Sequence, residues 1–365
     1  LFELEDYQSW INKVEDHLYS KQGQMGLNFD QIRSIRIVMN DRLRHMWDGF
    51  EIPCVFLPAS MQLKQVADIF EQLNTKGKIL GIFDLLMARL LKYHIRLREY
   101  WDGCQKRFPH TIARYSKKYG KIPVYLVQAM SLYLDKSARS AKREDILNIH
   151  DRLFKDNTLS FKNYWEELSL HMDWAISNLE NQVSGYGVKD EKEVPSVTMV
   201  TMSAALHKEV ENRADIGRCY EKMRIWYWAS VFTNAYSGAV DSTMSAHYKE
   251  LMSWFDDESQ TPSVVEQARR QVDSIDLTKM RSHYNAVYKG ILSLLFLEQA
   301  RDFAEKMEAG HARSYQRHHI FPKGANIAAP SHLIDSVLNI TWLTKATNQR
   351  LTKAKKPSVY LSELL

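Results

Sequence analysis

The sequence predicts a mainly α-helical protein that ends in a small strand–loop–strand–helix (ββα) unit. Two observations predict this fold. Apolar residues recur at three- and four-residue spacings over most of the 365 residues, which is the pattern of amphipathic helices. After Arg317 the pattern changes to short β-branched runs around a loop that contains Pro330, which is typical of strands. We expect three domains, at residues 1–100, 101–304 and 305–365.

The helical periodicity covers most of the first three hundred residues. We predict helices at residues 7–18, 62–73, 83–98, 141–154 and 161–180, and one helix, or two that meet at Gly290, at residues 280–307. Residues 184–197 and 256–262 are polar stretches with glycine or proline, so we expect loops there. The one strand expected in this part is residues 121–125, although Pro123 weakens it.

The C-terminal segment contains the strands of the ββα unit. Residues 318–321 form a short run that Pro322 stops, and residues 337–343 alternate in polarity and are rich in β-branched side chains. Thr344 is placed to cap a helix from Lys345 to about Lys355. A long loop is therefore expected to join two short strands, with a helix after the second.

Composition argues against several classes of protein. Cys54, Cys104 and Cys219 lie far apart and form no C-x-x-C pair, so we expect neither disulfides nor a cysteine zinc site, and a reducing cytoplasm fits best. No apolar stretch approaches the ~20 residues that span a bilayer, so no membrane partner is expected. The first residues lack the features of a signal peptide. Because the chain has no initiator methionine, we expect it to begin inside a longer gene product.

Positive charge gathers at the C-terminal end. Residues 311–365 carry eight Lys and Arg residues against two acidic ones, a formal charge of +6, while the whole chain carries +5. A polyanion such as DNA is the natural partner of this segment, although a solvated basic tail would have the same composition. The residues expected to contact DNA phosphates are Lys323, Arg350, Lys353, Lys355 and Lys356.

Four polar residues of the ββα unit have the chemistry of phosphodiester hydrolysis, which needs a base to activate water and a cation to offset developing charge. His319, at the end of the first strand, suits the base near neutral pH. Asn339 is expected to hydrogen-bond the loop or the imidazole of His319. His318 and Asn348 offer a nitrogen and an amide oxygen to a metal ion, and such coordination suits Mg²⁺ or Mn²⁺. The alternative is that both histidines are core or interface residues.

The same residues resemble a known motif. His319 to Pro322, Asn339 and Asn348 are similar to the HNH, or ββα-metal, endonuclease motif, including the nine-residue step between the two asparagines. The resemblance implies that His319 is the general base and that Asn348 lies at the metal. His318 stands where that family commonly has an aspartate metal ligand, which leaves the identity of the metal open.

A second resemblance lies upstream. Residues 70–80, with the sequence FEQLNTKGKIL, are similar to a segment of ParB/sulfiredoxin-like NTPase domains. Such domains occur in GmrSD-type modification-dependent restriction endonucleases and in the related SspE-like nickases, whose helical middle resembles residues 224–238. The resemblance implies that Asn74, Lys76 and Gly77 belong to a nucleotide-binding pocket. A turn that links two helices would explain the same three residues.

The D-G-Q-Q-R motif of those NTPase domains does not occur in this sequence. We therefore interpret residues 1–100 as the C-terminal part of such a domain, and we expect GTP or another NTP to bind only in the full-length protein. Residues 101–304 would then be the helical middle domain and residues 305–365 the HNH nuclease domain.

Together the resemblances imply a metal-dependent DNA endonuclease or nickase of bacterial defence, acting on phage DNA or modified foreign DNA. A homodimer could convert two nicks into a double-strand break. One other interpretation stays open, a non-catalytic DNA-binding or sensor module of an NTP-regulated defence protein. The missing D-G-Q-Q-R motif argues against a third, an NTP-driven regulator with a vestigial nuclease.

Overall fold

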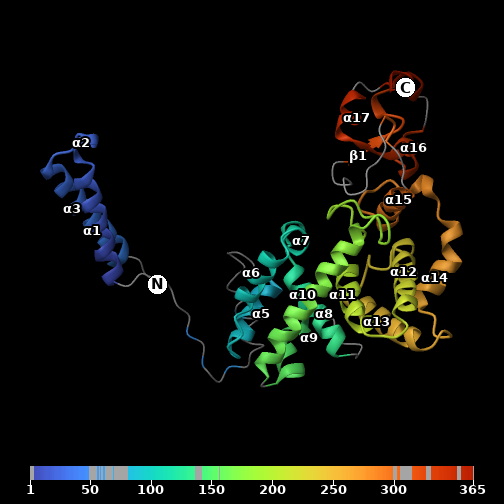
Figure 1. Ribbon diagram of the computed structural model, residues 1–365, viewed down its shortest axis with the longest axis horizontal. Coiled ribbons are helices and arrows are strands. Elements are labelled where there is room, and N and C mark those ends of the chain that lie inside the picture. The colour runs from blue at the N-terminus through green and yellow to red at the C-terminus, as the bar shows by residue number, and fades with distance from the viewer. Residues whose placement is uncertain are drawn as a thin grey trace. The chain divides into compact units, whose positions relative to one another are not determined.

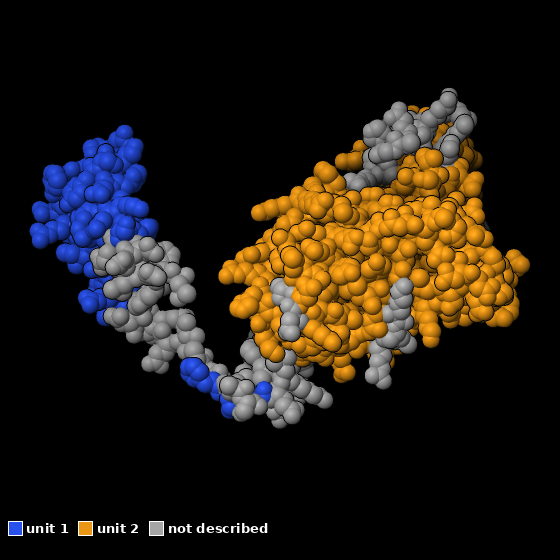
Figure 2. All heavy atoms as spheres, turned by 60° about the horizontal axis from the view of Figure 1, so that its bottom comes forward, with its two compact units in different colours: residues 1–73 blue, residues 74–365 orange. Residues whose placement is uncertain are grey.

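The computed structural model describes residues 4–48, 56, 58, 61, 69, 81–135, 142–155, 157–298, 302–304, 315–325, 330–351 and 355–364. The chain divides into two compact units, residues 1–73 and residues 74–365 (Figure 2). The three domains expected from the sequence, with boundaries after residues 100 and 304, stay a prediction. Within the described ranges, every helix is too short or too polar to cross a bilayer.

The first unit is a helical hairpin. Its described helices are α1 (Leu4–Ser20), α2 (Gln22–Met25) and α3 (Phe29–Asp48) (Figure 1). Helix α1 confirms the helix predicted at residues 7–18. Ile11 and Ile32 are buried, and Gly26 ends α2 with a φ of 65°. Most of the helix predicted at residues 62–73 lies outside the described residues, as do Asn74, Lys76 and Gly77.

The described part of the second unit is almost entirely helical, which confirms the mainly α class. Its helices before the sheet are α5 (Ile82–Leu91), α6 (Leu97–Arg107), α7 (Ile112–Tyr119), α8 (Ile122–Leu134), α9 (Arg143–Leu147), α10 (Thr158–Glu180), α11 (Thr198–Val210), α12 (Ile216–Phe232), α13 (Val240–Asp256), α14 (Ser263–Gln271) and α15 (Ala286–Leu297). Its last elements are β1 (Tyr315–His319), α16 (Ser331–Ile334), β2 (Ile340–Thr344), α17 (Lys345–Arg350) and α18 (Pro357–Leu364).

Helix α8 lies in the core of the helical body and packs against both α10 and α11. Ten of its thirteen residues are buried, because its sequence is apolar on every side. The strand predicted at residues 121–125 is therefore wrong, since these residues begin α8. Pro123 lies in the first turn of the helix, where its missing N–H costs no intrahelical hydrogen bond.

Two predicted helices are interrupted. The helix predicted at residues 83–98 ends at Leu91 and resumes as α6, with His94 in a left-handed conformation (φ 58°) between them. Ile95 and Leu97 on the far side of this break are fully or almost fully buried, so core packing decides the local conformation. Residues 141–154 contain α9 and a π-helical turn, His150–Phe154, instead of one regular helix.

The other helix and loop predictions of the body are confirmed. Helix α10 covers the helix predicted at residues 161–180 and starts after Asn157, whose side chain accepts a hydrogen bond from the Ser160 amide. The expected loop at residues 184–197 joins α10 to α11, and the expected polar break after Asp256 joins α13 to α14.

Gly290 does not interrupt a helix, so the predicted weak point is wrong. Helix α15 runs without a break through Gly290 but covers fewer residues than the predicted 280–307. A Cβ atom at Gly290 would lie 2.5 Å from Cγ1 of Val231 in α12. Glycine is needed there because the two helices approach closely.

The ββα unit at the C-terminal end of the second unit contains a two-stranded antiparallel sheet that lies between helices. In its register, Tyr315 lies opposite Thr344 and His319 opposite Ile340. One face of the sheet packs on α15, through Tyr315, Ile340 and Trp342 against Tyr288, Leu292 and Phe296. On the other face Leu343 packs with Leu351 and Tyr360, which follow α17 and lie in α18. Helix α15 therefore shares its core with the sheet and also packs against α12 of the helical body.

The predicted order of strand, loop, strand and helix is confirmed, with shifted boundaries. Strand β1 begins three residues before the predicted one, and β2 begins at Ile340 because Val337–Asn339 forms a 3-10 turn. Thr344 caps α17, since its side chain accepts a hydrogen bond from the Thr347 amide. Helix α18 is not among the helices predicted from the sequence; Pro357 is its first residue, a position that proline favours.

Candidate active site

His318 and His319 lie on opposite faces of β1. Successive side chains of a strand alternate between the two faces of its sheet. His318 lies on the face covered by α17 and α18, near the ring of Tyr360, and His319 lies on the face that packs on α15. The predicted metal ligand and the predicted base are therefore neighbours in the sequence that face two sides of one strand end.

His318 pairs with Asn348. The Nδ1 atom of His318 lies 2.8 Å from Oδ1 of Asn348, and because an amide oxygen only accepts, Nδ1 carries the proton in this pair. The amide of Asn348 is oriented by Gln316, whose Oε1 accepts from Nδ2 at 2.8 Å. The Nε2 atom of His318 is buried and has no hydrogen-bond partner among the described residues.

The His318–Asn348 pair fits a divalent metal ion. Two adjacent ligands of an octahedral Mg²⁺, each at ~2.1 Å, lie about 3 Å apart, close to the 2.8 Å between these two atoms. Burial lowers the pKa of His318, which keeps the imidazole neutral, as a metal ligand must be. Transfer of the proton from Nδ1 to Nε2 would free Nδ1 for the ion and give the buried Nε2 the N–H.

His319 lies in a small charged group that includes an acid the sequence analysis missed. Its Nε2 is 3.7 Å from Oδ1 of Asp335, and the same oxygen lies 2.6 Å from Nζ of Lys323. Burial and then the charge of Lys323 lower the pKa of His319, while Asp335 acts in the opposite direction. The lowered pKa favours the neutral imidazole, which is the form that accepts a proton.

One signal in the sequence points to Asp335: it is one of only two acidic residues in the basic segment 311–365. A second residue the sequence analysis missed is Asp302. Its carboxylate is buried and accepts a hydrogen bond of 2.6 Å from the amide of Thr344. Asp302 therefore fixes the start of α17, the helix that carries Asn348, from a position outside the predicted nuclease domain.

Asn339 holds the loop after β1 and does not contact the imidazole of His319. Its Oδ1 accepts from the Phe321 amide at 2.8 Å, and its Nδ2 donates to the carbonyl oxygens of Phe321 and Ile334 at 2.9 and 2.8 Å. Both amide hydrogens are used, so of the two expected roles the loop contact is confirmed and the imidazole contact is wrong. Asn339 is a positioning residue, because it ties the residues after His319 to the residue before Asp335.

The residues expected to contact DNA differ in exposure. Lys323, Arg350 and Lys356 are exposed, Lys355 is half-buried, and Lys353 lies outside the described residues. Arg350 ends α17, the helix that carries Asn348. Lys323 is paired with Asp335, as described above, so any contact of Lys323 with a phosphate would compete with this ion pair.

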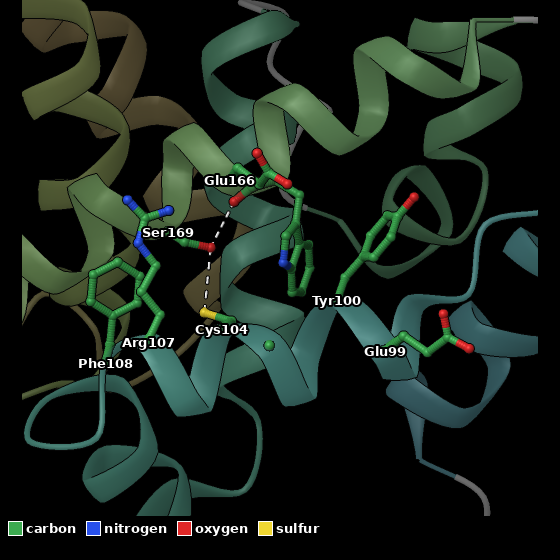
Figure 3. Close-up of a pocket in the computed structure, with 9 residues that line it drawn as sticks. Glu99, Tyr100, Cys104, Arg107, Phe108, Glu166 and Ser169 are labelled. Atoms are coloured by element: carbon green, nitrogen blue, oxygen red, sulfur yellow. Dashed lines mark hydrogen bonds between the residues drawn. The ribbon is translucent and has the colours of Figure 1, made fainter.

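A cavity of about 340 Å³ lies elsewhere, between α6 and α10 (Figure 3), and contains none of the predicted site residues. Its lining includes Cys104, whose thiol lies 3.4 Å from the hydroxyl of Ser169. Burial raises the pKa of the Cys104 thiol to about 11, so the reactive thiolate is not formed near neutral pH. Cys104 is therefore not an activated nucleophile.

Comparisons with known proteins give one relative and no activity. No family model and no solved structure matches the chain. The chain is 30% identical over 331 residues to an uncharacterized protein of Methanocaldococcus jannaschii, an alignment that covers 87% of this chain and 53% of that protein. The chain thus spans about half the length of this curated relative.

Proposed function

We propose that the C-terminal ββα unit is a metal-dependent DNA endonuclease or nickase of the HNH type. The observation that carries the proposal is the pairing of His318 with Asn348 at 2.8 Å on one face of β1, next to a neutral His319 that faces Asp335 on the other. A ligand pair and a base at one strand end are the two elements that phosphodiester hydrolysis requires.

His318 and Asn348 would hold the metal. A bound dication supplies positive charge that offsets the charge developing on the phosphate and the leaving oxygen. Because His318 offers nitrogen where an oxygen ligand is usual for Mg²⁺, we expect Mn²⁺ to support more activity than Mg²⁺. Gln316 keeps the Asn348 oxygen turned toward His318, so the ligand pair is oriented before an ion arrives.

His319 would accept a proton from the attacking water. The carboxylate of Asp335 faces Nε2 of His319 and therefore favours the tautomer with the N–H at Nε2. The lone pair of Nδ1 is then free to accept the proton of the attacking water. Asp335 is thus a positioning residue for the base. Lys323, through its ion pair with Asp335, tunes how strongly the carboxylate acts on the ring.

DNA is the proposed substrate because the segment that carries these residues has a formal charge of +6. A role in cytoplasmic defence against phage or modified foreign DNA, and a regulatory NTP site in a longer protein, rest on the resemblance to GmrSD-type endonucleases and SspE-like nickases. One base and one ion per chain make a nick the simplest product, and two chains acting together would yield a double-strand break.

Conversion of supercoiled plasmid to open circles, with Mg²⁺ or Mn²⁺ and with modified and unmodified DNA, tests the proposal. We expect cleavage that a chelator abolishes and that His319→Ala removes. The matched control is His332→Ala, which changes an exposed histidine of the same inter-strand connection. Absence of cleavage under all conditions, together with salt-sensitive binding that needs no metal, would instead support the non-catalytic DNA-binding module.

A further inference from the structure

Helices α10 and α11 bring two glutamates and two histidines together at a distance from the proposed nuclease site. Glu167 and His171 lie four residues apart on α10, and His207 of α11 lies four residues before Glu211, which caps the C-terminus of α11 in a helical conformation. Residues four apart share one face of a helix, and these two helices pack along each other. The ligand atoms of Glu167, His171 and Glu211 all lie within 4.8 Å of one another.

The two histidines define the proton positions in this cluster. Nδ1 of His171 lies 2.6 Å from Nδ1 of His207, so one of these nitrogens donates and the other accepts. Nε2 of His171 lies 3.5 Å from Oε2 of Glu211. If His171 donates from Nδ1, its Nε2 lone pair faces a carboxylate, and a cation between them would satisfy both groups.

Neutral imidazoles are available for this arrangement. Burial is the main cause that lowers the pKa of both rings, and the pKa of His207 falls to about 4. His207 is also held by Trp174, whose ring stacks on it at 3.7 Å between centroids. A fixed neighbour that accepts the Nδ1 proton is the usual second partner of a metal-bound histidine.

We propose that Glu167, His171 and Glu211 form a binding site for a first-row transition-metal dication between α10 and α11, with His207 as the partner that fixes the tautomer of His171. One imidazole nitrogen and two carboxylate oxygens suit Zn²⁺ or Mn²⁺. Distances of up to 4.8 Å between the ligand atoms need only small side-chain rotations to contract, since adjacent ligands of an ion lie about 3–3.5 Å apart.

The ammonium group of Lys208 competes with a metal ion for the two carboxylates of this site. This group bridges Glu167 and Glu211, and the lysine side chain is 10% exposed. A dication between the two carboxylates would displace this ammonium, which the flexible four-carbon stem of lysine permits. Metal affinity should therefore rise when the positive charge of Lys208 is removed and fall when a carboxylate is removed.

Calorimetric titration of the full chain with Zn²⁺, paired with the visible absorption of bound Co²⁺, tests the site. All variants are made in a His318→Ala background, so that binding at the proposed nuclease site does not contribute. We expect one equivalent of bound metal in this background, a Kd raised at least tenfold by Glu211→Gln, and a Kd lowered about tenfold by Lys208→Met. The matched control is Glu166→Gln, an exposed neighbour on α10, with an unchanged Kd.

Two outcomes would overturn the site. One is that no equivalent binds in the His318→Ala background, or that metal binds only after Lys208→Met, which would make Lys208 the resident cation. The other is that Glu211→Gln and Glu167→Gln, both at partly exposed side chains and checked for folding by circular dichroism, bind as tightly as Glu166→Gln. Neither outcome bears on cleavage by His319, so the two proposals fail separately.

Discussion

Two pairs of histidines in this chain have opposite relations between sequence and space. His318 and His319 are adjacent in the sequence, yet the strand directs their side chains to opposite faces. His171 and His207 are 36 residues apart, yet the packing of α10 on α11 brings their Nδ1 atoms to 2.6 Å. A strand separates neighbouring side chains, and a helix pair joins distant ones.

The surroundings of the two pairs also differ in charge. The strand pair is half-buried and lies in a segment of formal charge +6, which favours the approach of a polyanion. The helix pair is half-buried or buried beside Glu167 and Glu211, where a cation is favoured. The two proposals therefore use histidine differently: as a base and a metal ligand for DNA hydrolysis in one place, and as a metal ligand between glutamates in the other.

After loss of the base His319, removal of the Asn348 side chain should reduce the nicking rate most. We expect Asn348→Ala to reduce nicking at limiting Mn²⁺ by roughly a hundredfold, with partial recovery at high Mn²⁺, because a metal ligand is lost. Nicking rates measured against Mn²⁺ concentration check this. Gln349→Ala, on the adjacent exposed position, is the control, and equal losses in both variants would remove Asn348 from the metal site.

Asn339→Ala should cost about 2–3 kcal/mol in the free energy of unfolding, because three hydrogen bonds to part-buried backbone groups of Phe321 and Ile334 are lost. Denaturant titration of the full chain measures the loss, and nicking should fall with it as the loop beyond His319 loosens. Asn339→Asp keeps the acceptor for the Phe321 amide but places a carboxylate oxygen against the carbonyl oxygens of Phe321 and Ile334, so it should destabilise the chain at least as much as Asn339→Ala. A fully stable Asn339→Ala variant would show that the loop does not depend on this side chain.

Helix α15 packs on the C-terminal sheet and on α12 of the helical body. A substitution at Gly290 tests the contact with α12. Gly290→Ala places a Cβ atom against Val231 and should destabilise the chain by about 1–3 kcal/mol, as overpacked cores do. The control Gly217→Ala, in α12, meets no atom within 4 Å and should be neutral or slightly stabilising. Equal thermal stability of the two variants would mean that α15 and α12 do not pack as closely as described.

The acidic side of the pH–rate profile should reveal the neighbours of His319. A general base works unprotonated, so the rate should fall as the pH drops through a pKa that lies below the ordinary value of 6.5. Asp335→Asn removes a carboxylate that raises this pKa and should move the fall to lower pH. Lys323→Gln removes a charge that lowers it and should move the fall to higher pH. Shifts in the same direction would contradict the charge arrangement around His319.

Local patterns in the sequence predicted the parts of the structure that depend on local chemistry. The Thr344 cap, the loop before α11 and the order of elements in the ββα unit are examples. The break at His94 and the helix through Gly290 were not predictable, because contacts with distant residues decide them, as with Val231 against Gly290. Pro123 weakens the expected strand but starts no break, because it lies in the first turn of a helix.

The candidate site was predictable as a set of residues but not as an arrangement. His318, His319, Asn339 and Asn348 could be selected from residue type and spacing. The sequence did not predict that Asn339 holds only the loop, or that Asp302 and Asp335 complete the surroundings. The cluster on α10 and α11 was missed because each helix contributes only one glutamate and one histidine, and only their packing makes a site.

The most direct test of the account is the single-turnover nicking rate of His319→Ala with and without added imidazole, beside the wild-type chain and His332→Ala. The account predicts a loss of about 10²–10⁴-fold for His319→Ala, partial recovery with imidazole that still requires metal, and an unchanged rate for His332→Ala. Wild-type cleavage that persists in chelator, or equal rates for His319→Ala and the wild type, would contradict it.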